Sequence, residues 1–262
     1  MNNKEIYEAV LGMIDLTSLN GSDTYSKIEG MAMKVNRFHD EFPSLPLPAS
    51  ICVYPNFAST VSRTLTCSDV HVTVVGGCFP ASQSPLKVKL LECVSAVQDG
   101  ADEVDIVLAL NSFLEGNRDI AAAEIREIGS AIRRVREDVI LKVILETGAL
   151  TGDQIREASF LAMESGADFI KTSTGKMQPA ATPEAARIMC TCIGEYHART
   201  GRMVGFKPAG GISTPEDAVL YYGIVKDVLG DRWLDKRYFR FGASRMANNL
   251  ISALEGKEVK YY

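Results

Sequence analysis

The alternation of two kinds of segment is the feature that most restricts how this 262-residue chain can fold. Eight short runs rich in β-branched and apolar residues alternate with longer amphipathic stretches. Several of the short runs are apolar almost throughout, which is typical of parallel strands covered on both faces. The sequence predicts strands at residues 13–16, 50–54, 70–75, 103–108, 139–146, 169–172, 203–207 and 238–242.

The longer stretches carry local signals for helix starts. Three of them begin with Ser or Thr followed by proline, at positions 84–85, 182–183 and 214–215. A capping side chain followed by proline at the first helical position is a typical start of a helix. The sequence predicts helices at residues 23–40, 84–100, 115–136, 151–165, 182–200, 214–229 and 243–255.

Strands that alternate with helices form either a closed (β/α)8 barrel or a doubly wound open sheet. A dinucleotide-binding sheet should carry a glycine-rich turn after its first strand, but Asp15 is followed by Leu16, Thr17 and Ser18. A barrel needs about 250 residues as one unit, which suits this chain. We therefore predict an α/β fold, a (β/α)8 TIM barrel formed by residues 1–262 as a single domain. The short polar tail at 256–262 is expected to be mobile without substrate.

Composition and charge exclude several classes of partner. The net charge is −5 and no block of like charge occurs, so neither nucleic acid nor an anionic membrane is expected as a partner. The apolar runs are too short to span a membrane, and residues 1–10 lack the apolar core of a signal peptide, so we expect a cytoplasmic protein. The six cysteines and three histidines show no ligand spacing, so we expect reduced thiols, no metal and no other cofactor.

Charged side chains gather where the predicted strands end, which is the functional face of such barrels. Lysines occur on three consecutive strands, and each lies in an apolar run. A single lysine at a strand end is usually a solvated surface group, but three on adjacent buried strands favour a shared interior site. The lysines are Lys142, Lys171 and Lys207, and the accompanying carboxylates are Asp15, Asp105 and Glu146.

Converging lysines favour carbonyl chemistry. Two like charges 4 Å apart repel by about 4 kcal/mol at an effective dielectric near 20, which lowers the pKa of one lysine by roughly three units. A lysine with a lowered pKa is a free amine that attacks a carbonyl carbon. The iminium formed withdraws electrons from a neighbouring C–C bond and lets it break. A second lysine and an aspartate can depress the pKa and move protons.

Glycine-rich loops follow the last three predicted strands, at residues 172–176, 208–212 and 242–245. Loops after strands seven and eight commonly bind phosphate through backbone N–H groups and a helix N-terminus. Lys176, Ser244 and Arg245 can add side-chain donors. The joint position of these glycines favours a phosphorylated substrate.

Two lysine motifs carry a family resemblance. The segments FIKTSTGK at 169–176 and VGFKPAGG at 204–211 resemble the signature motifs of deoxyribose-phosphate aldolases. Supporting stretches lie at 15–17, 52–55, 101–105, 141–148 and 240–244, so the resemblance runs nearly end to end. It implies a (β/α)8 barrel and a class I, Schiff-base aldolase. The implied reaction is reversible cleavage of 2-deoxy-D-ribose 5-phosphate to acetaldehyde and D-glyceraldehyde 3-phosphate, in deoxyribonucleoside catabolism.

The resemblance also implies roles for individual residues. Lys171 matches the Schiff-base lysine and Lys207 the lysine that perturbs it. Asp105 matches the proton-transfer acid, which works with Lys142, and Tyr262 matches a C-terminal tyrosine that assists protonation of the enamine. The substrate-binding residues expected here are Asp15, Thr17, Cys52, Thr172, Gly175, Lys176, Gly210, Gly211, Gly242, Ser244 and Arg245.

One departure concerns the phosphate site. Some members of the family carry Arg where this chain has Ser213, and Ser where this chain has Arg245. We expect Arg245 to supply the missing positive charge from the neighbouring loop. Cys52 has two interpretations, a small buried side chain or a thiol that faces the pocket and is activated by the lysines.

Three alternatives stay open at this stage. A Schiff-base aldolase acting on another aldehyde fits the loop departures. A barrel isomerase or epimerase with Asp105 as base explains the phosphate loops but leaves Lys171 and Lys207 without a role. A non-catalytic binding barrel predicts that both lysines are dispensable. The expected partners are a phosphorylated deoxysugar and small aldehydes, and we expect a homo-oligomer, with a dimer favoured.

Overall fold

A computed structural model describes residues 2–262, and within them eight parallel strands form one sheet. The strand order is β7-β6-β5-β4-β3-β2-β1-β8. Parallel bridges from Phe206 to Phe239 and from Ala209 to Gly242 join the two ends of the sheet, so the predicted barrel is confirmed. The strands are β1 Ile14–Thr17, β2 Ser50–Val53, β3 His71–Gly76, β4 Glu103–Val107, β5 Ile140–Ile144, β6 Phe169–Lys171, β7 Gly205–Lys207 and β8 Phe241–Ala243.

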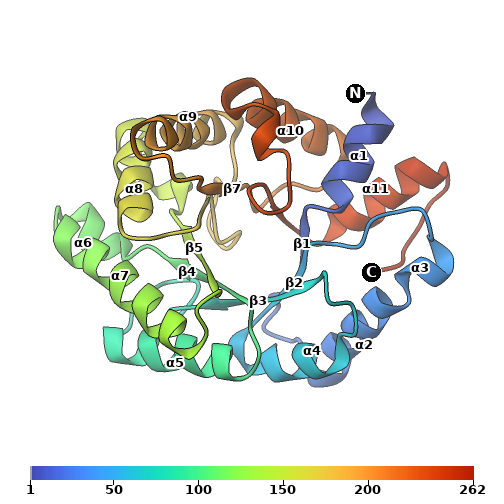
Figure 1. The fold of residues 1–262 in the computed structure, drawn as a ribbon, viewed down its shortest axis with the longest axis horizontal. Helices are drawn as coiled ribbons and strands as arrows, with labels where there is room; N and C mark the ends of the chain where they lie inside the picture. Colours follow the sequence, from blue (N-terminus) through green and yellow to red (C-terminus); the bar gives the residue numbers. More distant parts are fainter. Residues whose placement is uncertain (1) are drawn as a thin grey trace.

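Helices form a ring around the strands (Figure 1). The α-helices are α1 Asn3–Leu11, α2 Tyr25–Asn36, α3 Phe38–Glu41, α4 Ala58–Thr64, α5 Leu86–Gln98, α6 Leu110–Leu114, α7 Arg118–Val135, α8 Gly152–Glu164, α9 Pro183–Thr200, α10 Pro215–Leu229 and α11 Arg245–Glu255. Three 3-10 turns complete the set: η1 Pro55–Phe57, η2 Thr147–Ala149 and η3 Asp231–Trp233. The sequence missed α1, α4 and α6, and it joined α2 and α3, which are separated at Arg37.

The helix starts follow the predicted caps in two of three cases. The side chains of Thr182 and Thr214 accept hydrogen bonds from backbone N–H groups three residues on, and a proline follows each at the first helical position. Ser84 was predicted to cap the helix after the third strand, and that prediction was wrong. Helix α5 begins at Leu86, with Pro85 in the cap position and no side-chain cap.

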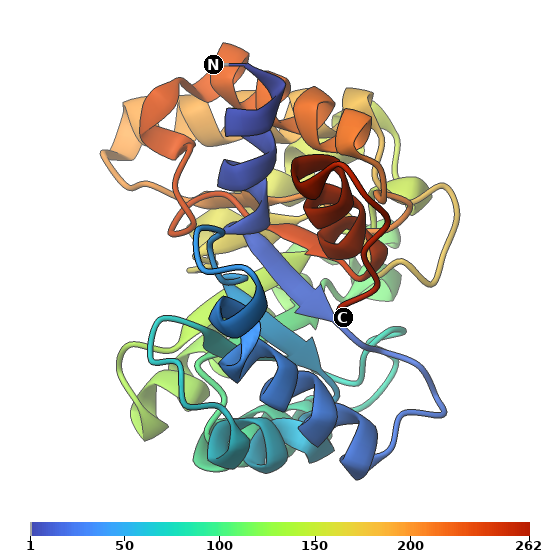
Figure 2. The same ribbon diagram turned by 90° about the vertical axis from the view of Figure 1, so that its right-hand side faces the viewer.

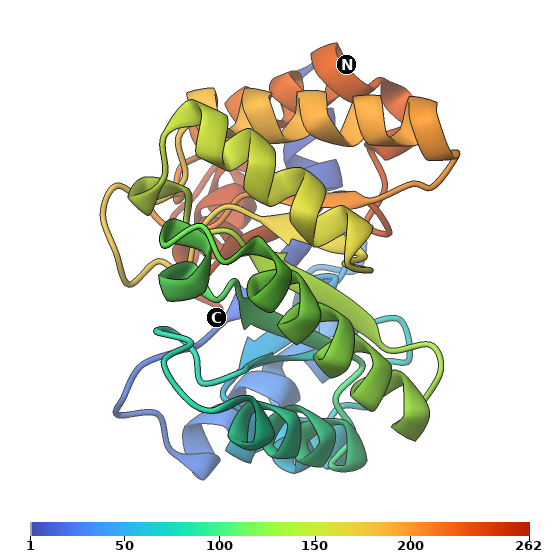
Figure 3. The same ribbon diagram turned by 90° about the vertical axis from the view of Figure 1, so that its left-hand side faces the viewer.

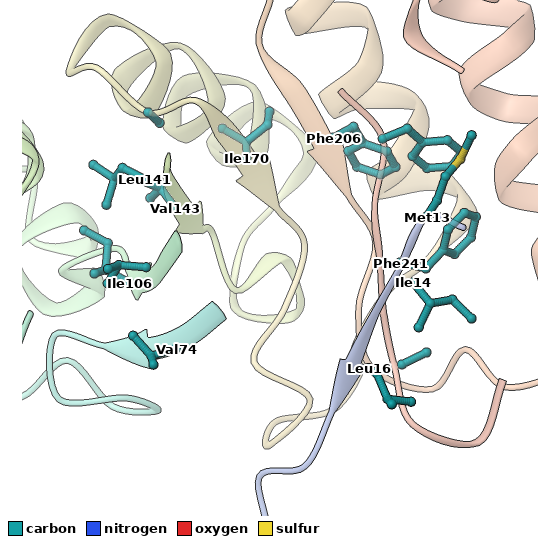
Figure 4. Packing of buried hydrophobic residues seen from close by; sticks show 14 of the residues in the cluster. Met13, Ile14, Leu16, Val74, Ile106, Leu141, Val143, Ile170, Phe206 and Phe241 are labelled. Atoms are coloured by element: carbon teal, nitrogen blue, oxygen red, sulfur yellow. The ribbon is translucent and has the colours of Figure 1, made fainter. Parts of the chain in front are cut away.

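Side chains of each strand alternate between two environments. Outward-facing residues pack in one hydrophobic core between the sheet and the helices, and Figure 4 shows ten of them labelled. Their neighbours along each strand point to the barrel axis. On β4, for example, Val104 and Ile106 belong to the core, whereas Glu103 and Asp105 are buried polar residues. The barrel interior therefore receives the charged residues of the strands.

The outer helices follow the chain around the barrel. Helices α5, α7, α8 and α9 lie side by side in this order (Figure 3). Helix α1 precedes the barrel and packs against α10 and α11 (Figure 2). No helix within residues 2–262 is both long and apolar enough to cross a membrane.

Candidate active site

Three lysines meet one aspartate inside the barrel. The carboxylate of Asp105 on β4 accepts hydrogen bonds from Lys171 Nζ at 2.9 Å and from Lys207 Nζ at 2.7 Å, both on Oδ2. Its other oxygen accepts from Lys142 Nζ at 3.0 Å. The parallel register places these residues on adjacent strands, with Asp105 beside Lys142 and Lys171 beside Lys207. The predicted convergence of lysines on an acid is therefore present in the structure.

A second layer of charges lies beside this aspartate, deeper in the barrel. Arg240 Nη1 donates to Asp15 Oδ1 at 2.6 Å, and Arg240 Nη2 donates to Glu103 Oε1 at 2.9 Å. Lys142 donates to Glu103, and Lys207 is paired with Asp15. The lower residues therefore connect directly to Lys142 and Lys207, two of the three lysines that hold Asp105.

Charges in the two layers balance only when one amine is neutral. The seven ionisable side chains are all at most 3 % exposed. Three are carboxylates and four are bases: Asp15, Glu103 and Asp105, with Lys142, Lys171, Lys207 and Arg240. Burying an uncompensated charge is costly, so one base should lose its proton. A guanidinium does not lose its proton in proteins, so the neutral group must be a lysine.

Burial and neighbouring charges shift the pKa values of the three lysines in different directions. Burial lowers the pKa of Lys171, and the ammonium of Lys207 lowers it further against the opposing charge of Asp105. Burial also disfavours the charge of Lys207, but Asp105 and Asp15 outweigh it and raise its pKa. The carboxylates likewise outweigh burial at Lys142 and raise its pKa. Lys171 is therefore the lysine that is neutral most readily.

The causes of the lowered pKa of Lys171 differ from those expected from the sequence. The expected causes were repulsion between ammonium groups and the influence of an aspartate. Burial is the larger cause at Lys171, and Asp105 acts in the opposite direction. The pKa of Asp105 itself is held far below its usual range because the neighbouring lysines, Lys142 foremost, outweigh the opposing effect of its burial.

An aromatic ring packs against two of the cations. The ring of Phe169 lies 5.9 Å from Lys142 Nζ and 5.8 Å from Arg240 Cζ, within range of cation–π attraction. Gly205 on the next strand makes room for this ring, since a Cβ there would lie 2.3 Å from Phe169 Cε1. Packing therefore requires a glycine at this position of β7, because the absence of a side chain lets the Phe169 ring lie against both cations.

A cavity of about 610 Å³ opens above Lys171. It lies at the carboxyl ends of β1, β6, β7 and β8 and is bounded on one side by α2 and α11. Five basic side chains and no Asp or Glu side chain line it, although the chain as a whole carries net charge −5. The basic residues are Lys27, Lys34, Lys171, Lys176 and Arg245. Such a lining attracts an anionic ligand.

Thr17 lines this cavity, and so do all of the residues predicted to bind phosphate. These residues are Gly175, Lys176, Gly210, Gly211, Gly242, Ser244 and Arg245. Gly210 has a φ of +84°, and a Cβ there would lie 2.7 Å from Ala180 Cβ, so only glycine fits. Lys176 is anchored by a hydrogen bond from Nζ to the carbonyl of Leu19 at 2.6 Å.

Glu146 lies apart from the lysines, contrary to the grouping made from the sequence. Strand β5 ends at Ile144, and Glu146 adopts a left-handed conformation with a φ of +54°. Its carboxylate accepts hydrogen bonds from Thr174 N at 3.1 Å and from Thr174 Oγ1 at 2.5 Å. Glu146 therefore holds the loop that carries Gly175 and Lys176.

Three predicted substrate-binding residues do not line the cavity. Asp15 belongs to the charge network below it. The side-chain hydroxyl of Thr172 donates to the carbonyl of Ala209 and accepts from its backbone N–H, and so ties two loops together. Cys52 is fully buried against Leu19, and burial raises the pKa of its thiol. Burial and the raised pKa of the thiol favour the buried interpretation of Cys52 over the activated-thiol interpretation.

The C-terminal tail is packed, whereas the sequence predicted a mobile one. Asn248 Oδ1 accepts hydrogen bonds from the backbone N–H groups of Tyr261 at 3.0 Å and Tyr262 at 2.9 Å. The Tyr262 ring stacks on Phe38 with centroids 5.7 Å apart. Tyr262 lines the cavity, but its hydroxyl is buried and has no hydrogen-bond partner within residues 2–262. Burial raises the pKa of this hydroxyl.

Sequence reasoning missed two members of the charge network, Glu103 and Arg240. A signal for both was present in the strand period. Glu103 lies two residues before Asp105, and Arg240 lies two residues before Gly242, so each shares the inward face of its partner. Elsewhere, no three His, Cys, Asp or Glu side chains of the described chain are arranged to hold a metal ion.

The fold and the site define an enzyme of the (β/α)8-barrel class, with its reactive groups at the carboxyl ends of the strands. The comparison with known families narrows this class. The chain belongs to the family described as DeoC/LacD family aldolase, whose model matches residues 9–222. It is therefore an aldolase, a carbon–carbon lyase.

Known relatives agree with this assignment. A Caenorhabditis elegans protein named "Putative deoxyribose-phosphate aldolase" is 41% identical over 257 residues, which cover 97% of this chain and 83% of that protein. The structure of a protein of the same name from Coccidioides immitis matches with a TM-score of 0.76 at 27% identity, covering 97% of this chain and 98% of the other.

A more distant structure shares the fold. The deoxyribose phosphate aldolase of Aeropyrum pernix, described as having a unique tetrameric structure, matches with a TM-score of 0.73 at 23% identity. The match covers 96% of this chain and 92% of the other.

Proposed function

We propose that this aldolase is of class I and cleaves 2-deoxy-D-ribose 5-phosphate reversibly to acetaldehyde and D-glyceraldehyde 3-phosphate. The observation that carries the proposal is Lys171, a buried amine with a lowered pKa that also lines a cationic cavity. A neutral amine at this position is a nucleophile toward an aldehyde. The name of the Caenorhabditis elegans relative and the basic side chains that line the cavity support the phosphorylated sugar as substrate.

The proposed chemistry uses the open-chain sugar. The Lys171 amine adds to the C1 aldehyde, and loss of water gives an iminium. A base removes the proton of the C3 hydroxyl, the C2–C3 bond breaks, and its electron pair moves to the iminium to form an enamine. D-glyceraldehyde 3-phosphate leaves, the enamine takes a proton at C2, and water releases acetaldehyde and regenerates the amine.

The charge network supports the proton movements of this scheme. Asp105 contacts Lys171, Lys207 and Lys142, so it connects the reactive nitrogen to two ammonium groups that can return protons. The low pKa of Asp105 keeps it ionised, which opposes an isomerase mechanism with Asp105 as a lone strong base. We therefore assign proton transfer to the lysine–aspartate cluster as a unit.

The phosphate is assigned to the glycine-rich loops. Gly175, Gly210 and Gly211 offer backbone N–H groups at the cavity wall, and Lys176 and Arg245 add positive charge. Arg245 is the first residue of α11, so the N-terminal end of that helix adds to the attraction. In this assignment, Arg245 supplies the positive charge that some family members carry at the position of Ser213.

Borohydride trapping tests the proposal. The protein is incubated with 2-deoxyribose 5-phosphate and EDTA, reduced with borohydride, and mapped by peptide mass spectrometry. We expect one reduced adduct, on Lys171, and none in a Lys171→Met variant, while Lys207 and Lys142 serve as internal controls. A folded protein without an adduct would contradict the Schiff-base mechanism for this sugar. If only a different aldehyde gave an adduct, the proposed substrate would have to be changed.

We propose that Tyr262 assists protonation of the enamine, because it lines the same cavity as Lys171. A Tyr262→Phe variant keeps the ring that stacks on Phe38 and removes only the hydroxyl. We expect a lower kcat in this variant and slower exchange of deuterium into acetaldehyde. Unchanged exchange would show that another group delivers the proton.

Assembly, location and pathway are further proposals. We propose a homo-oligomer, with a dimer favoured, a cytoplasmic location and a role in deoxyribonucleoside catabolism. Because the Aeropyrum pernix relative is described as tetrameric, light scattering on the purified protein is the direct test of dimer against tetramer.

A further inference from the structure

Arg240 occupies an unusual place for an arginine. Its side chain lies inside the barrel, and the residue is only 2 % exposed. The guanidinium bonds Asp15 Oδ1 at 2.6 Å and Glu103 Oε1 at 2.9 Å. It does not line the cavity, so it has no contact with a substrate bound there. Its only ionic contacts within the described chain are these two carboxylates.

The two carboxylates held by Arg240 also face the catalytic lysines. Asp15 Oδ2 is paired with Lys207 and lies 3.6 Å from Lys142 Nζ. Glu103 accepts a hydrogen bond from Lys142. Without a fixed cation below them, both acids would add negative potential to the site and favour a protonated amine there. Arg240 is the one base of the network whose charge does not depend on pH.

We propose that Arg240 is a positioning residue that neutralises Asp15 and Glu103 and thereby keeps Lys171 as the uncharged amine. The inference rests on the proposed function, in which Lys171 is the nucleophile. With Arg240 charged, the three carboxylates face three cations, namely Arg240, Lys142 and Lys207, and protonating Lys171 would bury an excess positive charge. Without Arg240, the three carboxylates would be balanced by Lys142, Lys207 and a protonated Lys171.

The groups that act on Lys171 come from every part of the barrel. The nearest charges are Asp105 on β4 and Lys207 on β7, and the thiol of Cys52 on β2 adds a smaller effect. The more distant charges are Asp15 on β1, Glu103 on β4, Lys142 on β5 and Arg240 before β8. His71 on β3 contacts Glu103 at 2.7 Å from a half-exposed position at the outer end of the network. Altering Arg240 or Glu103 removes no hydrogen bond to Lys171 or to its partner Asp105.

Removing a positive charge and removing a negative charge should shift the pKa of Lys171 in opposite directions. A unit charge about 10 Å away at an effective dielectric near 20 shifts an ionisation by about one pH unit. Arg240→Gln removes a positive charge, so the acid limb of the kcat/KM profile should move about one unit to higher pH. Glu103→Gln removes a negative charge at nearly constant volume, so the limb should move to lower pH. The double variant should lie near the wild type.

Two further variants separate charge from packing. Arg240→Lys keeps the charge and loses the paired geometry, so its limb should stay near the wild-type position even where its rate is lower. Arg237→Gln changes an exposed arginine of the same loop, which is paired with Asp235, and should not move the limb. A purely structural role for Arg240 predicts lower rates in every variant of Arg240 and Glu103, with unmoved limbs.

The ionisation of Lys171 can also be followed without any turnover. The pH dependence of its acetylation by acetic anhydride, measured by peptide mass spectrometry, reports the fraction of free amine. Opposite shifts in the two single variants with restoration in the double variant would support the proposal. Shifts of equal sign, or unmoved profiles in both, would overturn it. If Arg240→Gln does not fold, an unmoved Glu103→Gln profile alone overturns it.

The two proposals fail in different ways. A wild-type protein without a borohydride adduct refutes the Schiff-base function, whatever the acetylation profiles show. A wild-type adduct on Lys171 together with unmoved profiles in the variants refutes only the role of Arg240.

Discussion

Replacing Lys207 with methionine is the sharpest test of how Lys171 is kept neutral. Lys207 is fully buried, and its ammonium shares one oxygen of Asp105 with Lys171. The change removes a positive charge beside Lys171 and leaves that oxygen to Lys171 alone. Both effects favour the protonated amine. The remaining buried charges would then balance with Lys171 charged.

The magnitude follows from the geometry. The two lysine nitrogens lie 2.9 Å and 2.7 Å from the same oxygen. They are therefore no more than about 6 Å apart, where like charges repel by about 3 kcal/mol at an effective dielectric near 20. This energy corresponds to about two pH units in the ionisation of Lys171. At a pH on the acid side of both the wild-type and the Lys207→Met profiles, the fraction of Lys171 present as free amine should be about 100-fold lower in the variant. The value of kcat/KM should be lower by the same factor.

The assay is the pH dependence of kcat/KM for 2-deoxyribose 5-phosphate cleavage, which reports groups of the free enzyme. The Lys207→Met profile should move to higher pH, and much of the lost rate should return at alkaline pH. Lys207→Arg keeps a charge and should show a profile near the wild-type position. A uniform loss of rate at every pH in Lys207→Met, in a protein with unchanged thermal unfolding, would refute the reasoning.

Three further outcomes are expected. Arg245→Ala should raise the KM of the phosphorylated sugar about 10-fold with little change in kcat, because a charge-assisted hydrogen bond is worth about 1.5 kcal/mol, and an unchanged KM would contradict the phosphate assignment. Burial raises the pKa of the Cys52 thiol, so iodoacetamide should label Cys78 in the folded protein well before Cys52, and mass mapping that finds the reverse order would count against this. Gly205→Ala should cost about 1–3 kcal/mol, since its Cβ would lie 2.3 Å from the Phe169 ring, and an unchanged unfolding temperature would show that the ring moves freely.

The fold was largely readable from the sequence. Strand and helix positions depend on local periodicity, which survives without knowledge of the tertiary structure. The two helices that begin Thr–Pro start where predicted, because capping by Thr182 and Thr214 involves only residues of the same turn. The short helices α4 and α6 were missed, since seven and five residues carry too little periodicity to be recognised. The predicted Ser84 cap failed because a cap depends on local geometry that residue type alone does not fix.

The inward direction of the lysines was also predictable in part. Lys171 and Lys207 lie on adjacent strands, each on a face opposite to the apolar residues Ile170 and Phe206. Glu146 shared that face by counting, yet the strand ends before it and its side chain binds Thr174 instead. Where a strand ends depends on the loops around it, which the counting of alternate residues does not include.

The sequence by itself determined the elements, the chemistry of the side chains and the strands that carry them, because these follow from local propensity and periodicity. Only the tertiary structure decided which charges meet. Closure of the barrel brings Arg240 to Asp15 and Glu103 across 225 and 137 positions of the chain. Burial then removes water from the cluster, so the number of charges requires one neutral amine, and the burial and neighbours of each lysine make that amine Lys171. Neither the number nor the neighbours could be established before every strand had a place in the barrel.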